Sequence, residues 1–245
     1  MLSNIDTRTL RDHTYKAIKD LILKNEFLPG HEIPIRKLAA DLGISETPVR
    51  EALVMLKAEG LVDYEPHKKP QIANITEEEI RQLYEVRKLI EPYAVSLVIE
   101  TFSRNPELKK KIEQLDVLVQ RLIETPYEVW DYDEYVEIDL KLNELFFQAT
   151  ENRIFREVFT LVSSRSMRIR TFVEATSKVR GSSLMHEITR EHRAIIQAML
   201  REDREDARGR VREHLANAEA RTLQEMKSYV ENLRALEESR APIGK

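Results

Sequence analysis

The chain has 245 residues and no cysteine, which excludes disulfides and thiolate metal sites and fits a reducing compartment. It contains no run of about 18 or more apolar residues and no signal-peptide core, so we expect a cytoplasmic protein without a membrane segment. The net charge is −4, and residues 1–75 carry 11 Lys/Arg against 11 Asp/Glu, so global charge gives no indication of nucleic-acid binding.

The first part of the chain has the pattern of a helix-turn-helix. Apolar positions from Leu10 to Ile22 predict a helix that ends at Asn25–Gly30, and F-L-P-G-H-E-I-P predicts a turn and a very short extended piece. A short helix is predicted over Ile35–Leu42, with Gly43 as its stop. A second helix follows after a tight turn, which is the helix-turn-helix arrangement.

The second of these helices, within Ser45–Leu61, is the candidate DNA recognition helix. Thr47 and Pro48 supply an N-cap and a first-turn proline, with Ser45 as an alternative cap, and Gly60 supplies a C-terminal stop. Arg50 lies near the N-terminus, where a major-groove helix presents a base-reading side chain. Four apolar residues form the stripe that is predicted to be buried: Val49, Ala52, Leu53 and Leu56. The segment L-V-D-Y-E-P-H-K-K-P-Q-I-A then predicts a small β-hairpin, or wing.

These motifs resemble the winged helix of the GntR family of transcription regulators over residues 10–73. The matching motifs are P-G at 29–30, L-A at 38–39, L-G-I-S at 42–45, T-P-V-R-E-A-L at 47–53 and E-G-L-V at 59–62. The resemblance implies DNA contacts from Arg36, Thr47 and Arg50, and a wing tip that reaches the minor groove through His67. Solvated helix charges are the alternative interpretation of the two arginines.

Two residues depart from the family pattern. Glu46 stands where the family usually has Arg, which removes one positive contact or reverses its sign. Lys68, beside Lys69, stands where the family usually has a wing glycine. We expect the two lysines to contact phosphates, although simple loop solubilisers would have the same composition. The preferred operator is therefore expected to differ from that of typical relatives.

The remainder of the chain is predicted to be an all-helical bundle. Thr76-x-x-Glu79 is a capping box that opens a helix through about Thr101. Five more helices are expected, over 106–124, 127–150, 152–176, 183–201 and 203–237. The fold class is therefore mainly α: a winged helix-turn-helix DNA-binding domain over 1–75, and a helical effector-binding and dimerisation domain over 76–245.

Polar residues interrupt the apolar stripes of this bundle. They are Asp139 and Asn143 in the helix 127–150, His192 in the helix 183–201 and His214 in the last helix. A buried carboxylate needs a cation or a network of hydrogen-bond donors. One carboxylate oxygen, one amide oxygen and two imidazoles would suit Zn²⁺, Ni²⁺ or Mn²⁺. Hydrogen-bonded core histidines are the alternative interpretation.

Residues 77–230 resemble the FCD ligand-sensing domain of FadR-type GntR regulators. The matching motifs are V-R-K-L-I-E-P-Y-A at 86–94, D-L-K-L-N-E-L-F-F at 139–147, E-H-R-A-I-I-Q-A-M at 191–199 and V-R-E-H-L at 211–215. Many members bind a divalent metal through one Asp and three His. The resemblance carries this role to Asp139, His192 and His214, with Asn143 at the remaining His position. An amide oxygen binds such metals more weakly than imidazole does.

The resemblance also implies a small carboxylate effector, such as a hydroxy acid or a sugar acid. Arg87 matches an arginine of the first FCD helix, and a guanidinium can bind a carboxylate through two parallel hydrogen bonds. An ion pair with Glu91, four residues later, is the alternative for Arg87. Arg168 and Arg170 are weaker effector candidates on the same argument.

The sequence therefore predicts a ligand-responsive transcriptional repressor and not an enzyme. A short helix-turn-helix reads one half-site, so we expect a homodimer on double-stranded DNA with a palindromic operator. Two other classes remain open at this stage. One is a helical metalloenzyme with a His/His/carboxylate site. The other is a helical interaction protein with a non-functional winged helix, which Glu46 and the neutral charge of residues 1–75 would favour.

Overall fold

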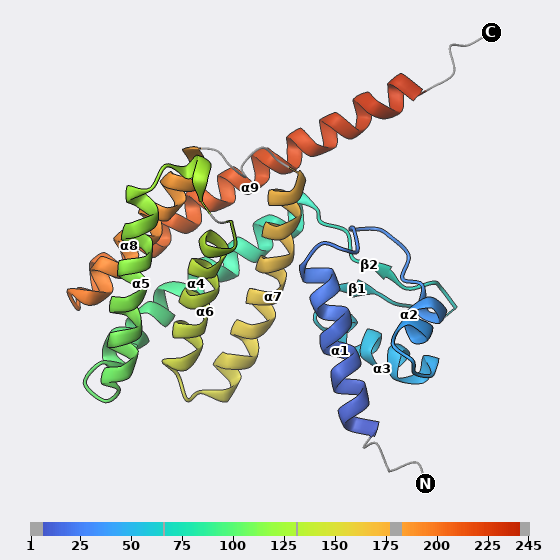
Figure 1. The fold of residues 1–245 in the computed structure, drawn as a ribbon, viewed down its shortest axis with the longest axis horizontal. Helices are drawn as coiled ribbons and strands as arrows, with labels where there is room; N and C mark the ends of the chain where they lie inside the picture. Colours follow the sequence, from blue (N-terminus) through green and yellow to red (C-terminus); the bar gives the residue numbers. More distant parts are fainter. Residues whose placement is uncertain (1–6, 66, 131, 177–182, 241–245) are drawn as a thin grey trace. The chain divides into compact units, whose positions relative to one another are not determined.

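The structure is a computed structural model that describes residues 7–65, 67–130, 132–176 and 183–240 (Figure 1). Its contacts divide the chain into two compact units. Unit 1 comprises Met1–Thr76 and Ser164–Phe172, and unit 2 comprises Glu77–Ser163 and Val173–Lys245. The predicted mainly helical class is confirmed. In the described ranges, no helix combines the length and the apolar character that crossing a membrane would require.

The N-terminal part of unit 1 contains three helices and a two-stranded hairpin in its described residues. The elements are α1 Thr7–Leu23, α2 Ile35–Asp41, α3 Glu46–Ala58, β1 Val62–Asp63 and β2 Gln71–Ile72. The strands are antiparallel and pair Val62 with Ile72 and Asp63 with Gln71. The predicted extended piece before α2 forms an isolated bridge from Glu32 to Gln71. The predicted wing is therefore present as a short hairpin.

The core of unit 1 lies beneath α3. Helices α1 and α2 both pack on α3. The predicted apolar stripe of α3 is confirmed as buried, and Leu53 and Leu56 are among the fully buried side chains. They share one cluster with Ile18 from α1 and with Ile72 from the wing. Burial of this stripe fixes the rotation of α3, so the opposite face, which carries Arg50, is exposed.

The start of α3 differs from the prediction that Thr47 is its cap. Ser45 is the N-cap, with extended backbone at φ −74° and ψ 166°, and Thr47 lies inside the first helical turn. Pro48 is also in this turn, where a missing N–H is tolerated because the first amides of a helix have no intrahelical acceptor. Gly43, in the turn between α2 and α3, has a φ of +66°, a left-handed conformation that favours glycine.

Unit 2 is a helical bundle. Its elements are α4 Glu77–Thr101, α5 Pro106–Glu124, the 3₁₀ turn η1 Tyr127–Val129, α6 Tyr132–Gln148, α7 Arg153–Thr176, α8 Ser183–Leu200 and α9 Arg204–Arg240. Residues Ser164–Phe172 of α7 are grouped with unit 1. Helix α4 packs along α9, while α8 packs against both α5 and α9. The predicted helices agree with this order, with one exception.

The exception is the predicted helix 127–150, whose first residues form η1 while α6 starts at Tyr132. Thr125 ends α5 with extended backbone, as expected for a residue before proline. The indole Nε1 of Trp130 donates to the carbonyl oxygen of Thr125 at 2.8 Å and so closes a compact connection. A tight turn therefore replaces the first helical turn that periodicity had suggested.

Candidate functional site

The N-terminus of α3 carries a pair of opposite charges. Arg50 donates from one terminal nitrogen to the Oε2 of Glu46 at 2.7 Å and from the other to the hydroxyl oxygen of Tyr64 at 3.2 Å. These two hydrogen bonds, that to Glu46 first, raise the pKa of Arg50 above its ordinary value. The Arg50 side chain remains 51% exposed. The candidate base reader is thus accessible and has a defined orientation.

The other predicted DNA contacts in unit 1 are also accessible. Arg36 is 94% exposed, and its Nε lies 3.4 Å from the Oε1 of Glu46, so Glu46 faces two predicted readers. Thr47 is exposed in the first turn of α3. His67 is exposed near the wing tip, with a φ of +64°. The contacts of Glu46 with Arg36 and of Arg50 with Tyr64 depend on the tertiary fold, and the sequence interpretation did not include them.

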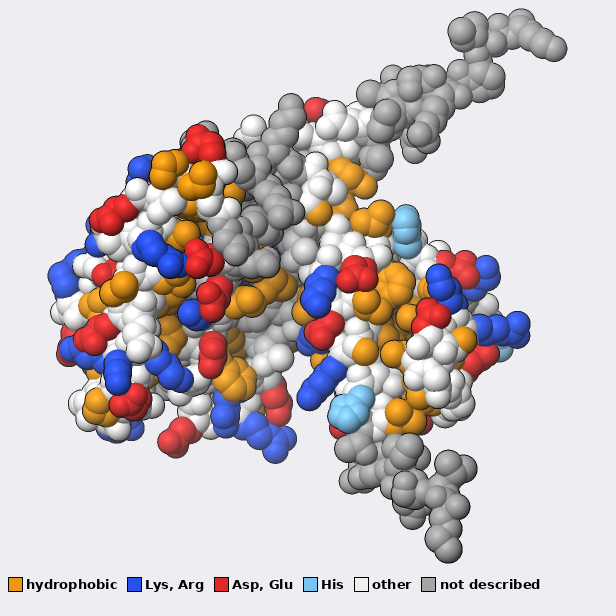
Figure 2. Space-filling model, in the orientation of Figure 1, with side chains coloured by type: hydrophobic (Ala, Val, Ile, Leu, Met, Phe, Trp, Pro, Cys, Tyr) orange, Lys and Arg blue, Asp and Glu red, His pale blue; other side chains and the backbone are white. Residues whose placement is uncertain are grey.

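The two wing lysines each have an acidic neighbour. Lys68 pairs with Glu65 at 2.7 Å, and Lys69 pairs with Glu32 at 2.8 Å. Figure 2 shows basic and acidic side chains interspersed over the visible face of the molecule. The four predicted DNA-contacting cations Arg36, Arg50, Lys68 and Lys69 therefore each have an acidic neighbour, with Glu46 shared by the two arginines.

Two of the four predicted metal ligands lie together in unit 2. His192 on α8 is 3% exposed, and its ring centroid lies 4.7 Å from that of His214 on α9. Burial, together with the charges of His192 and Arg87, lowers the pKa of His214 to about 4 despite the hydrogen bond to Glu191. The His214 imidazole is therefore neutral at pH 7, which is the form that binds metals.

Glu191 holds His214 in place. Its Oε2 accepts a hydrogen bond from the Nδ1 of His214 at 2.7 Å, which makes Nδ1 the protonated nitrogen and leaves the lone pair on Nε2. Arg221 donates two hydrogen bonds to the Glu191 carboxylate, at 2.9 and 2.8 Å, and Asn217 donates a third at 2.8 Å. Burial opposes ionisation of Glu191, but the bonds from Arg221 and His214 outweigh it and hold the pKa of Glu191 well below its usual value.

The other two predicted ligands, Asp139 and Asn143, both belong to α6. Asp139 is on the backbone of α6, but its side chain lies outside the described residues. Asn143 is half-buried on the same helix, and its Oδ1 accepts a hydrogen bond from the Ser163 hydroxyl at 3.4 Å. Among the side chains that the structure describes, no three His, Cys, Asp or Glu residues gather as a metal site. The donor chemistry of the two neighbouring imidazoles nevertheless fits a borderline divalent cation.

The predicted effector arginines occupy different places. Arg87 donates from Nε to the Oε1 of Glu91 at 2.6 Å and lies over the Tyr84 ring, so the alternative ion pair is present. Arg168 and Arg170 belong to the α7 segment that groups with unit 1. Arg168 is 3% exposed and donates to the Ala73 carbonyl oxygen at 2.6 Å. Arg170 donates to the sulfur of Met167 at 3.0 Å. The effector role of all three stays a prediction.

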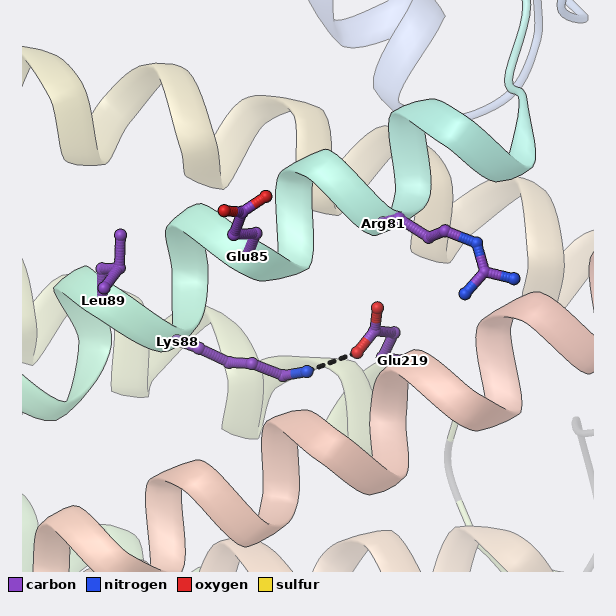
Figure 3. Close-up of a pocket in the computed structure, with 5 residues that line it drawn as sticks. All are labelled: Arg81, Glu85, Lys88, Leu89 and Glu219. Atoms are coloured by element: carbon purple, nitrogen blue, oxygen red, sulfur yellow. Dashed lines mark hydrogen bonds and ion pairs between the residues drawn. The ribbon is translucent and has the colours of Figure 1, made fainter.

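A surface pocket of about 430 Å³ lies between α4 and α9 (Figure 3). It is lined by Arg81, Glu85, Lys88, Leu89 and Glu219. Lys88 and Glu219 point toward each other across it and form an ion pair. The pocket contains none of the predicted ligands, and the ion pair between Lys88 and Glu219 links α4 to α9.

Two family descriptions match the chain. Residues 10–68 match "Bacterial regulatory proteins, gntR family", and residues 82–217 match "FCD domain". The uncharacterized HTH-type transcriptional regulator YdhC of Bacillus subtilis strain 168 is 27% identical over 205 residues, or 82% of this chain and 85% of that protein. The gluconate operon transcriptional repressor of the same organism is 26% identical over 174 residues, or 68% of this chain and 66% of that protein.

Solved structures with the same fold include E. coli McbR/YncC. Its TM-score is 0.72 at 19% identity, and the alignment covers 89% of this chain and 98% of that one. The Zn²⁺-bound FCD domain of TM0439 aligns with a TM-score of 0.49 at 19% identity, over 64% of this chain and 100% of that domain. The first likeness supports the fold alone, and zinc in the second is a property of that domain.

Proposed function

Because the chain belongs to the GntR family of bacterial regulatory proteins and carries an FCD domain, we propose that it is a ligand-responsive transcriptional repressor whose helical domain binds a divalent metal and a small carboxylate. Its family consists of DNA-binding regulators rather than enzymes. The proposed metal site in the helical domain is supported by the buried pair of His192 and His214, with Glu191 orienting His214. In this proposal residues 1–75 bind DNA and residues 76–245 sense the effector in the cytoplasm.

DNA recognition is assigned to the exposed side of α3 and to the wing. Arg50 and Thr47 would enter the major groove from the first turn and a half of α3, where recognition helices contact base edges. Arg36, Lys68 and Lys69 would contact phosphates or flanking bases, and His67 would approach the minor groove. The exposure of all these side chains supports the assignment. Glu65 and Glu32, the acidic partners of Lys68 and Lys69, would exchange places with DNA oxygens on binding.

A homodimer would place two α3 helices on the two halves of a palindrome, about 34–36 Å apart. Helix α4 has an apolar stripe that supports such an interface. Val86, Leu89 and Tyr93 follow each other at helical spacing and are 37%, 72% and 54% exposed. Large apolar side chains grouped on one exposed helix face commonly mark a protein interface. We therefore assign this stripe to the dimer contact.

The substitution Leu89→Arg is expected to convert the dimer into monomers, because it places a charge in an apolar contact. Sedimentation-equilibrium centrifugation measures the mass, and DNA titration then shows a loss of tight operator binding. Val117→Arg is the matched control, since Val117 on α5 is 71% exposed and lies outside the stripe. A dimeric Leu89→Arg protein, or equal dissociation of both variants, would argue against the stripe as the interface.

His192 and His214 would hold the metal, with Asp139 and Asn143 as the remaining ligands by family resemblance. The bound ion would supply positive charge for a carboxylate effector. Glu191 and Arg221 do not themselves reach the ion in this proposal. They fix the tautomer and ring orientation of His214, as outer partners of metal-bound histidines commonly do.

Arg87 is the first candidate to bind the carboxylate of an effector. Its charge is one of those that lower the pKa of His214, which supports a role for the guanidinium beside the proposed metal centre. An effector would have to share the guanidinium with Glu91. Gluconate is a reasonable first test compound, since a similar protein is the gluconate operon transcriptional repressor.

Metal analysis and a thermal-shift screen test the sensing part of this proposal. The full-length protein is purified and stripped with chelator, and unfolding is followed with Zn²⁺, Ni²⁺ or Mn²⁺ and a panel of hydroxy and sugar acids. A ligand at about 100 times its Kd stabilises the folded state by about 2.7 kcal/mol. We expect one metal to raise the Tm and at least one acid to raise it further only when metal is present. A Tm unchanged by every metal and acid would contradict the sensing role.

A further inference from the structure

Glu46 occupies an unusual position for an acidic residue on a DNA-facing surface. It is the first residue of α3, and it forms ion pairs with Arg50, one turn later on the same helix, and with Arg36 from α2. A negative charge is stabilised at a helix N-terminus, so the position is compatible with an acidic residue. On binding DNA, however, it would face phosphates of the same sign. The residue therefore reduces general attraction to DNA at the place where the proposed readers lie.

The geometry gives this acidic residue a second effect. The two terminal nitrogens of Arg50 are held by different elements, one by Glu46 on α3 and the other by Tyr64, which follows β1. A flexible arginine otherwise loses side-chain entropy when it binds a base. Two fixed hydrogen bonds restrict the guanidinium before DNA arrives. They also restrict how far it can turn toward a neighbouring phosphate.

We propose that Glu46 is a positioning residue that makes Arg50 a selective reader of guanine, at the expense of general DNA affinity. The inference rests on the proposed DNA-reading function of α3. Guanine offers the two major-groove acceptors, O6 and N7, that match a guanidinium. With Glu46 present, Arg50 binds where a guanine lies within reach of its fixed orientation. Where no guanine is present, the negative charge of Glu46 opposes binding, so discrimination against other bases increases.

Removing this charge should therefore have opposite effects on affinity and on selectivity. In Glu46→Gln, both Arg36 and Arg50 are released to contact phosphates. We expect binding to random duplex DNA to tighten about three- to tenfold, with a salt dependence that steepens by about 0.9 for each added phosphate contact. Discrimination at the base pair that Arg50 reads should fall about tenfold, within the range of one bidentate base contact. An exposed pair of this kind contributes little to stability, so the Tm should not change.

Tyr64→Phe separates positioning from charge. The ring of Tyr64 packs against the core of unit 1, and phenylalanine keeps that packing while it removes the hydroxyl that accepts from Arg50. This variant should lose discrimination without gaining affinity for random DNA. Glu51→Gln is the matched charge control, because Glu51 is an exposed acid on the same helix. It should gain some affinity for random DNA and keep full discrimination.

The experiment starts from a pool of randomised duplexes, from which the full-length protein and its Arg50→Ala variant each select a consensus. The base pair that only the wild type selects is the one read by Arg50. Fluorescence anisotropy then gives the Kd of each variant for the consensus duplex, for a duplex with A·T at that pair, and for random DNA, at two salt concentrations. The ratio of the first two values is the discrimination.

Reduced discrimination in both Glu46→Gln and Tyr64→Phe, with tighter random binding only in the former and in Glu51→Gln, supports the inference. Unchanged discrimination in Glu46→Gln, while the wild type selects a clear consensus, overturns the inference and leaves the proposed function intact. Loss of discrimination in Glu51→Gln equal to that in Glu46→Gln also overturns it, because charge alone would then explain the effect. A wild type that selects no consensus overturns the DNA-reading function and this inference together.

Discussion

Replacing Arg50 with alanine is expected to weaken operator binding by about 2–6 kcal/mol, or roughly 30-fold to 10⁴-fold. One bidentate contact between arginine and guanine contributes about 1–3 kcal/mol, and a dimer on a palindrome loses two of them. Arg50 is exposed, and its hydrogen bonds are to two residues that remain in the variant, so the fold should persist. Fluorescence anisotropy on the selected duplex measures the loss, and circular dichroism verifies the helical content.

Lys57→Ala is the control for this prediction, because Lys57 is an exposed cation in the last turn of the same helix. Its loss should weaken binding to all duplexes to a small and similar extent. Arg50→Ala should in addition flatten the preference at one base pair in each half-site. Equal losses for the two variants, with the base preference intact, would show that Arg50 contributes charge rather than sequence recognition.

Replacing His214 with alanine is expected to lower the affinity for zinc by at least about 100-fold, because loss of an outer partner of a metal ligand alone lowers affinity about 10–100-fold. The variant removes a neutral imidazole whose Nε2 lone pair is directed by the bond from Nδ1 to Glu191. Calorimetric titration of chelator-treated protein gives the affinity. The rise in Tm that zinc produces in the wild type should disappear as well.

Two variants make this result specific. Glu191→Gln keeps all four ligands and should lower zinc affinity less than His214→Ala, since the ring of His214 remains but loses its orienting carboxylate. His13→Ala removes an exposed histidine of unit 1 and should leave zinc binding unchanged. Stoichiometric, equally tight zinc binding by His214→Ala would exclude His214 as a ligand.

Helix positions were largely predictable because apolar periodicity and the capping and stop residues of a helix are local signals in the sequence. The stripe through Leu53 and Leu56 placed α3, and the capping motif at Thr76 agrees with the start of α4 at Glu77. Two helix starts, those of α3 and α6, differed from the prediction. Ser45 and Thr47 are both residue types that favour the N-cap. The structure has Ser45 at that position, with extended backbone. The turn made by Trp130 shortened α6 through a contact that helical periodicity does not encode.

The candidate sites were less predictable, because their partners come from separate elements. The pair of Glu46 and Arg50 is visible as an i, i+4 spacing, but Arg36 and Tyr64 join it only through the fold. Glu191 directly precedes His192 in the sequence, yet it serves His214 on the next helix together with Arg221. Such charge networks depend on how the helices pack. Sequence spacing predicts contacts within one helix, but it does not predict contacts between residues on two different helices.

We propose that a carboxylate bound in the helical domain changes operator affinity, and a DNA titration with and without effector tests this proposal. The zinc-loaded full-length protein is titrated into the selected duplex at fixed ionic strength, alone and with each acid of the panel. We predict that at least one acid changes the Kd about 5- to 150-fold, the usual range of coupling between two sites, and that chelation of the metal abolishes the change. A Kd that stays constant across the whole panel, with metal bound, would contradict the claim.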